Sequence, residues 1–319
     1  MGGKVPGGSC HRRAPAILLS GAAGAYARRV TRIFDGSTPQ RHRTIGQAVA
    51  DRQDLLLVGD AAATLVDLPP ATVQTVVTSP PYWSLRDYTT DGQIGMDEPL
   101  PAFLKALVGI FAEVGRVLAD DGTVWVNLGD SYTSGNRGWR APDPKNPARA
   151  MRSRPPTPEG LKDKDLIGVP WRFALAMQEA GWWLRADVVW YKPNCQPESV
   201  RDRPTRSHEH IFLFSKSENY HYDVDTVRGP NGRRLRDVWE INTVAYPGAH
   251  FATFPPELVR RCVLIGSRQD DYVLDPFLGS GTTAIVARQQ ARRFIGCEVN
   301  PDYAGLVTAR LSEPGLVTP

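Results

Sequence analysis

The chain has 319 residues, of which 41% are hydrophobic and 23% charged, and its formal net charge at pH 7 is +4. This is the composition of a globular protein long enough to bury a substantial core, in one large domain or two ordinary ones. No apolar run approaches the roughly 18 residues of a membrane span, and the mildly basic balance is compatible with a polyanionic partner.

The cysteine content indicates a reducing compartment. The four cysteines are far apart and lack the spacing of metal ligands, so we interpret them as free thiols and not as a disulfide framework. The apolar segment APAILLSGAAGAYA near the amino terminus has a centre, AILL, that is too short for a secretion signal. We therefore expect a cytoplasmic protein without a membrane partner or a metal site.

Residues 1–45 are rich in Gly, Ala and Arg with weak periodicity, which is typical of a disordered N-terminal extension. We expect one domain over residues 46–312 and a tail at 313–319. In this domain LLLVGD (55–60) and TVQTVV (72–77) are predicted strands, residues 99–122 a helix with a good terminator, and GTVWVNLGDSY (122–132) another strand.

Residues 134–165 change the character of the chain. They carry many Arg and Lys residues and almost no apolar ones, which predicts a long basic loop. Helices are then predicted over 170–185, 255–266, 282–291 and 301–311, and strands over 186–194, 208–217, 271–275 and 293–299. Strands that alternate with helices in this way predict one doubly wound α/β sheet.

The segment DPFLGSGTT (275–283) lies where a predicted strand turns into a helix. Gly279 and Gly281 permit a tight turn and the close approach of a ligand, and the helix N-terminus offers free N–H groups. The third glycine of the dinucleotide fingerprint and the Gly-Lys-Ser/Thr of a phosphate loop are both missing. Glu298 ends the next strand, where an acid can bind a ribose diol. A nucleoside ligand such as S-adenosylmethionine fits; a plain glycine turn with a solvated Glu298 is the alternative.

The stretch TSPPYW (78–83) ends the predicted strand 72–77 with two prolines, which cannot continue a ladder of hydrogen bonds. An exocyclic amino group of a base is a poor nucleophile and needs acceptors that draw its hydrogens out of the ring plane. Ser79 Oγ and the carbonyl of Pro80 can be those acceptors, Tyr82 can stack on a flipped base, and Trp83 could line the same pocket. Transfer of this kind needs no covalent nucleophile, and no cysteine follows a proline as carbon-5 cytosine methylation would require.

Together these motifs resemble a bacterial or phage DNA amino-methyltransferase of the circularly permuted beta group, over roughly residues 55–311. The resemblance implies a seven-stranded, mostly parallel sheet with one reversed strand and helices on both faces, and S-adenosylmethionine as methyl donor. The positions that match the catalytic motif are Ser79, Pro80, Pro81 and Tyr82. Those that match the cofactor site are Asp60, Thr253, Phe254, Pro255, Asp275, Phe277, Gly279, Gly281, Thr282 and Glu298.

The segment VVWYKPN resembles the family's target-base segment, which assigns Trp190 and Lys192 to that side. Each assignment has a plainer alternative: Asp60 as a turn cap, Trp190 as a core residue, Lys192 as a surface lysine. His250 is expected to organise its loop, and Asp130 is either a pocket residue or a helix cap.

Serine before the two prolines favours cytosine N4 as the acceptor in such a family, with adenine N6 as the alternative. The expected partner is double-stranded DNA, together with a cognate restriction endonuclease encoded elsewhere, and the expected state is a monomer or homodimer. DNA contacts are expected from the 134–165 loop and the Arg-rich segments at 201–206 and 232–236. The arginines chosen as DNA contacts are Arg137, Arg140, Arg201, Arg203 and Arg206. An RNA methyltransferase and a catalytically inactive DNA-binding module remain alternatives.

Overall fold

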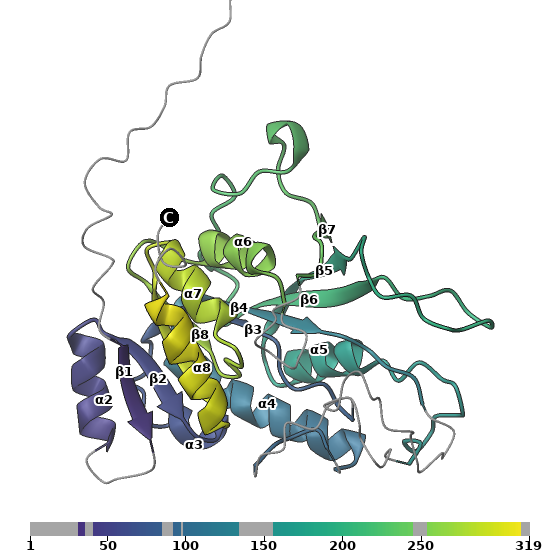
Figure 1. Ribbon diagram of the computed structural model, residues 1–319, viewed down its shortest axis with the longest axis horizontal. Coiled ribbons are helices and arrows are strands. Elements are labelled where there is room, and N and C mark those ends of the chain that lie inside the picture. The colour runs from purple at the N-terminus through teal and green to yellow at the C-terminus, as the bar shows by residue number, and fades with distance from the viewer. Residues whose placement is uncertain are drawn as a thin grey trace, which may run out of the picture.

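The computed structural model describes residues 31–35, 41–84, 92–96, 98–133, 156–244 and 254–313. The described strands form one nine-stranded sheet in the order β1-β2-β9-β8-β3-β4-β6-β5-β7 (Figure 1). Their bounds are β1 Thr31–Asp35, β2 Asp54–Val58, β3 Val73–Thr78, β4 Leu118–Leu128, β5 Trp183–Tyr191, β6 His208–Ser215, β7 Val238–Glu240, β8 Tyr272–Asp275 and β9 Arg293–Glu298. Among them β6 alone runs antiparallel to both neighbours, β4 and β5.

Helices cover both faces of the sheet, because successive residues of the central strands face opposite sides. Leu55 and Leu57 of β2 join a core with one group of helices, whereas Leu56 joins the core on the other face. The first group is α2 Arg41–Ala50, α3 Ala61–Leu65, α4 Leu100–Val117 and α5 Val169–Glu179; the second is α6 Pro256–Gly266, α7 Thr282–Gln289 and α8 Pro301–Ser312. A short 3-10 turn at Pro230–Gly232 lies outside these layers. In the described part of the chain no helix is both long and apolar enough to cross a membrane.

The chain order and the sheet order differ in the way a circular permutation produces. Strands β8 and β9, from the last third of the chain, lie between β2 and β3 from the first third. Figure 1 shows this as yellow carboxyl-terminal elements between the purple and the blue ones. The connection after β8 leads to one side of the sheet and the connection after β3 to the other. The carboxyl ends of β3 and β8 therefore form the switch point at which α/β sheets bind ligands.

The α/β fold with one reversed strand is as predicted, but the sheet has nine strands where seven were expected. The additional strands are at its two edges. Strand β7 pairs with β5, and β1 pairs with β2 in the register Thr31↔Asp54 to Asp35↔Val58. Strand β1 and half of α2 fall in the segment expected to be an extension, so ordered structure begins before residue 46. Strand β1 (TRIFD) lacks the alternation of apolar and polar residues that predicts a strand, and it is recognised by its backbone pairing with β2. Residues 1–30 lie outside the described residues.

A buried ion pair at the amino end of β2 joins this strand to the carboxyl-terminal elements. Asp54 is fully buried; it accepts hydrogen bonds from Arg288 Nε at 2.7 Å and from the Phe294 backbone N–H at 3.1 Å. Removal of one partner leaves the other charge buried without its counter-charge, which lowers the free energy of unfolding.

We expect Asp54→Ala to lower the free energy of unfolding by about 3–5 kcal/mol, because Arg288 is left buried without its carboxylate. Urea unfolding followed by circular dichroism measures this. The matched control is Asp202→Ala, which removes a solvent-exposed pair with Lys164 and should leave the free energy of unfolding nearly unchanged. Equal losses for the two variants would contradict the structural role of the buried pair.

Candidate functional site

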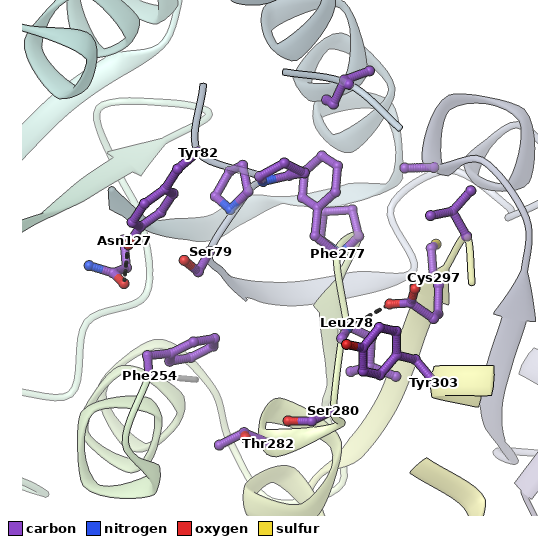
Figure 2. Close-up of a pocket in the computed structure, with 18 of the residues that line it drawn as sticks. Ser79, Tyr82, Asn127, Phe254, Phe277, Leu278, Ser280, Thr282, Cys297 and Tyr303 are labelled. Carbon is purple, nitrogen blue, oxygen red and sulfur yellow. Dashed lines mark hydrogen bonds between the residues drawn. The ribbon is translucent and has the colours of Figure 1, made fainter. Parts of the chain in front are cut away.

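A pocket lies at the carboxyl ends of β2, β3, β8 and β9, where the sequence places its two main motifs (Figure 2). One half is lined by the glycine loop after β8 and the acids that end β2 and β9. The other half is lined by Ser79–Tyr82 after β3 and by side chains of β4, β5 and β6. Figure 2 shows Ser79 beside Tyr82 and Asn127, on the side of the pocket away from Tyr303 and Cys297. The two predicted half-sites therefore open into one cavity.

The glycine loop depends on its glycines for two separate reasons. Gly279 and Gly281 have φ angles of +54° and +85°, a region that residues with a Cβ rarely occupy. A Cβ on Gly281 would also lie 2.9 Å from Val307 Cγ2 of α8. The loop is held from beneath by the buried Arg310, which donates to the carbonyl of Ser280. Thr282 then begins α7, whose N-terminus faces the pocket with its partial positive charge.

Glu298 lies at the end of β9 with 7% of its surface exposed, and it lines the pocket. Its two oxygens accept the backbone N–H of Gly279 at 2.7 Å and of Asn300 at 2.8 Å. Burial raises the pKa of Glu298 to about 7 against these hydrogen bonds, and the nearby Asp275 adds to the rise. The carboxyl group is thus fixed in place, and each oxygen retains a further lone pair for a ligand hydroxyl.

Asp60 is a helix cap, the plainer of the two roles that the sequence left open, and it also lies on the pocket wall, where its predicted cofactor contact would be. Its Oδ1 accepts the Ala63 N–H at 2.9 Å and so caps α3, while the residue also lines the pocket. Phe254 and Phe277 line the pocket as well. Pro255 is buried and precedes the first turn of α6. Thr253 lies outside the described residues.

Asp275 connects the two halves from below the pocket. It is fully buried; its Oδ1 accepts the hydroxyl of Thr78 at 2.6 Å and the N–H of Phe277 at 3.0 Å, and its Oδ2 accepts the hydroxyl of Thr283 at 2.7 Å. Thr78 is the residue directly before Ser79. Burial raises the pKa of Asp275 to about 6, although these hydrogen bonds favour the carboxylate. The predicted cofactor residue thus acts as a tie between the glycine loop and the end of β3.

The target-base half contains a polar network around Tyr82. Ser79, Pro80, Pro81 and Tyr82 all line the pocket. The hydroxyl of Tyr82 donates to Glu209 Oε2 at 2.8 Å and lies 3.3 Å from Asn127 Oδ1. Sequence reasoning missed both Glu209 and Asn127, as well as Tyr303. A polar residue within an apolar stretch was the available signal for Asn127, since buried polar groups in strands need partners. Glu209 lies between His208 and His210 at the polar start of β6, where no such signal stands out.

Trp190 and Lys192 line the same half. Trp190 is 3% exposed and donates its indole N–H to the carbonyl of Ile241 at 2.8 Å, so it is a core residue with one face on the pocket. Lys192 is not a surface lysine: its side chain is 15% exposed, its ammonium pairs with Glu209, and it lies 4.2 Å from the Trp190 ring centroid.

Trp83 lies in the hydrophobic core instead of the pocket wall. It is 3% exposed and donates its indole N–H to the carbonyl of Glu98 at 2.9 Å. The chain turns after Tyr82, and Trp83 packs in the core on the face of the sheet that carries α3 and α4. Asp130 also has a structural role, because it accepts the backbone N–H groups of Gly168 and Val169 at the start of α5.

The arginines expected on DNA are placed only in part. The guanidinium of Arg203 pairs with Glu198 at 2.6 Å and stacks 3.8 Å from the ring centroid of Tyr132, and that of Arg206 lies 6.0 Å from the same ring. Arg201 is exposed. Arg137, Arg140 and His250 fall outside the described residues, and of the 134–165 loop residues 156–165 are described.

The described residues contain no group of three or more His, Cys, Asp or Glu side chains that could hold a metal ion. The residues that line the pocket supply hydrogen-bond acceptors, an ion pair, a thiol, aromatic rings and a helix N-terminus.

Residues 73–309 match the family profile described as DNA methylase. Among similar proteins, the Type II methyltransferase M.Cfr9I of Citrobacter freundii is 58% identical over 260 residues, which is 80% of this chain and 87% of that protein. The Type II methyltransferase M.SmaI of Serratia marcescens is 55% identical over 262 residues, 80% of this chain and 90% of that protein.

Two solved structures have a similar fold. The PvuII DNA methyltransferase (cytosine-N4-specific) is 22% identical with a TM-score of 0.63, over 82% of this chain and 86% of that chain. A putative DNA modification methylase from Thermus thermophilus, complexed with S-adenosyl-L-methionine, is 28% identical with a TM-score of 0.59, over 82% of this chain and 94% of that chain.

The raised pKa of Glu298 predicts a pH dependence of stability. Its pKa is near the ordinary value of 4.5 in the unfolded chain and about 7 in the folded protein, so the folded state binds more protons between these pH values. The contribution of Glu298 to the free energy of unfolding is therefore greatest below about pH 4.5. As the pH rises to 7, the free energy of unfolding falls by roughly 1–3 kcal/mol because of this group.

Chemical unfolding of the ligand-free protein at pH 4.5 to 7.5 measures this slope. In Glu298→Gln the decline should be smaller by that amount, leaving the part due to Asp275, while the exposed control Glu179→Gln should keep the full decline. An unchanged decline in Glu298→Gln would show that Glu298 is ionised throughout.

Proposed function

The chain belongs to the DNA methylase family, and on that premise we propose that it transfers a methyl group from S-adenosylmethionine to cytosine N4 of a base flipped out of duplex DNA. One observation carries the proposal: the glycine loop with its acids and the Ser79–Tyr82 segment line a single pocket. A donor and an acceptor bound in the two halves would meet inside it.

The cofactor half has the donor and acceptor groups that an adenosyl ligand requires. Glu298 would accept hydrogen bonds from the ribose diol, and Asp60 would accept from the adenine side. Phe277, Tyr303 and Val299 supply apolar walls, and the N-terminus of α7 together with the glycine backbone accommodates the methionine carboxylate. When bound, S-adenosylmethionine supplies an electrophilic methyl group.

In the other half the chain supplies acceptors and a stacking surface. Ser79 Oγ and the carbonyl of Pro80 accept the hydrogens of the amino group and so localise its lone pair on nitrogen. The consecutive prolines cannot donate and have fixed φ angles, which keeps these acceptors in position. Tyr82 provides a ring on which a flipped base stacks. Cys297, a thiol that also lines the pocket, lies in the cofactor half next to Glu298, so direct transfer remains the simplest route.

The preference for cytosine N4 rests on Ser79 at the first position of the SPPY motif, and the cytosine-N4-specific PvuII enzyme shares the fold. Adenine N6 is the alternative acceptor. Because similar proteins are named Type II methyltransferases, we further propose that the modification protects sites from a cognate endonuclease. The Arg201–Arg206 segment is positioned by Glu198 and Tyr132 and would contact the DNA backbone.

Transfer of labelled methyl groups onto unmodified duplex DNA, followed by hydrolysis and mass analysis of the nucleosides, tests the reaction. We expect N4-methylcytosine as the product. N6-methyladenine would overturn the choice of base, and label transferred to RNA but not to DNA would overturn the substrate.

Ser79→Ala should lower kcat by roughly 10²–10³-fold, the usual cost of removing one oriented polar group from a reaction centre. The dissociation constant for S-adenosylmethionine, measured by calorimetry, should stay within about twofold, since Ser79 is on the base side. Ser312→Ala on the exposed end of α8 is the matched control and should keep full activity. If Ser79→Ala also keeps it, Ser79 is not the acceptor.

A further inference from the structure

The reversed strand β6 places a carboxylate inside the target-base half. The side chain of Glu209 is 14% exposed, and its oxygens receive three donors. The ammonium of Lys192 reaches Oε1, while the Tyr82 hydroxyl at 2.8 Å and the Asn127 amide at 3.0 Å reach Oε2. The same amide lies 3.2 Å from the carbonyl of His210, which fixes it to the backbone of β6.

Glu209 remains ionised in this position. Burial alone would raise its pKa, but the charge of Lys192 and the hydrogen bonds from Lys192, Tyr82 and Asn127 outweigh burial and lower the pKa below its ordinary value. An ionised carboxylate only accepts hydrogen bonds, so the Tyr82 hydroxyl must donate to it. The hydroxyl is therefore engaged by Glu209 and Asn127 on the pocket wall, and what Tyr82 offers to a base is its ring.

Gly129, directly after β4, packs against the same two side chains. A Cβ on Gly129 would lie 2.7 Å from Tyr82 Cε2 and 3.2 Å from Glu209 Oε1. The Tyr82 ring is thus held at its hydroxyl by Glu209 and at its edge by the backbone of Gly129.

From this geometry we propose that Glu209 is a positioning residue for methyl transfer: it acts through Tyr82, whose ring it holds in the orientation that a flipped base stacks on. The inference rests on the proposed function. A general-base role does not fit, because all three donors point at the carboxylate and direct transfer needs no strong base. Lys192 contributes by keeping the carboxylate charged.

A double-mutant cycle tests the coupling. Glu209→Gln has nearly the same shape, but its amide cannot accept from both Lys192 and the Tyr82–Asn127 pair, so the ring should lose its fixed orientation. Tyr82→Phe keeps the ring and removes the anchor. Each change should lower kcat by roughly 10- to 100-fold, as small misplacements in a reacting centre do.

If Glu209 acts through Tyr82, the double variant should be no slower than the slower single variant within about twofold. The calorimetric dissociation constant for S-adenosylmethionine should be unchanged in all three, which a general loss of folding would not allow. Losses that multiply, or wild-type kcat in Glu209→Gln, would overturn the proposal.

Gly129→Ala decides the question if Glu209→Gln does not fold, because it keeps every charge and displaces only the ring and the carboxylate. It should lower kcat while the melting temperature shifts by a few degrees at most. Its control is Gly305→Ala in α8, where a new Cβ meets nothing within 4 Å. Full activity of Gly129→Ala would refute the positioning role. A wild-type chain that methylates no DNA would instead refute the proposed function, and with it any role of Glu209 in that reaction.

Discussion

The hydrogen bonds of Asp275 fix the distance between the two halves of the pocket. One buried carboxyl group binds the hydroxyl of Thr78, at the end of β3, and the backbone of the glycine loop after β8. These segments are almost two hundred residues apart in the chain, and pairing of β3 with β8 alone would leave their loops free to move. A transfer reaction depends on the distance between donor and acceptor. The hydrogen bonds of Asp275 therefore position the glycine loop and the Ser79–Tyr82 segment relative to each other, which neither loop could do alone.

The two halves that Asp275 connects are built from different kinds of interaction. The cofactor half depends largely on backbone, through glycines with positive φ and a helix N-terminus, to which two acidic side chains at strand ends are added. The base half is built from side chains of β4, β5 and β6 and of the segments that follow β3 and β5. Among them, Lys192, Glu209, Tyr82 and Asn127 form one network of hydrogen bonds and an ion pair. Such a network stabilises one arrangement when it is complete and is costly when one member is lost.

Much of the site could be predicted from the sequence because it follows strand ends. Gly279, Glu298 and Ser79 each come directly after an apolar run, and the carboxyl ends of parallel strands meet at one edge. Asn127 and Glu209 lie inside strands, and their meeting depends on the antiparallel pairing of β6 with β4, in which Asn127 is opposite Ile211. No local pattern specifies that register. Trp83 was expected to line the pocket but lies in the core. The direction of a side chain after a turn depends on the residues it packs against, which the local sequence does not specify.

The order of strands also constrains how the protein forms. During synthesis β2 and β3 emerge first, but in the finished sheet they are separated by β9 and β8, which emerge more than two hundred residues after β2. Until then the central edges of both strands, which are buried along their whole length in the finished sheet, have no native partner. Long-range pairing of this kind slows folding, and exposed strand edges favour aggregation. The arrangement that brings the two half-sites together thus delays completion of the sheet until β8 and β9 have been synthesised.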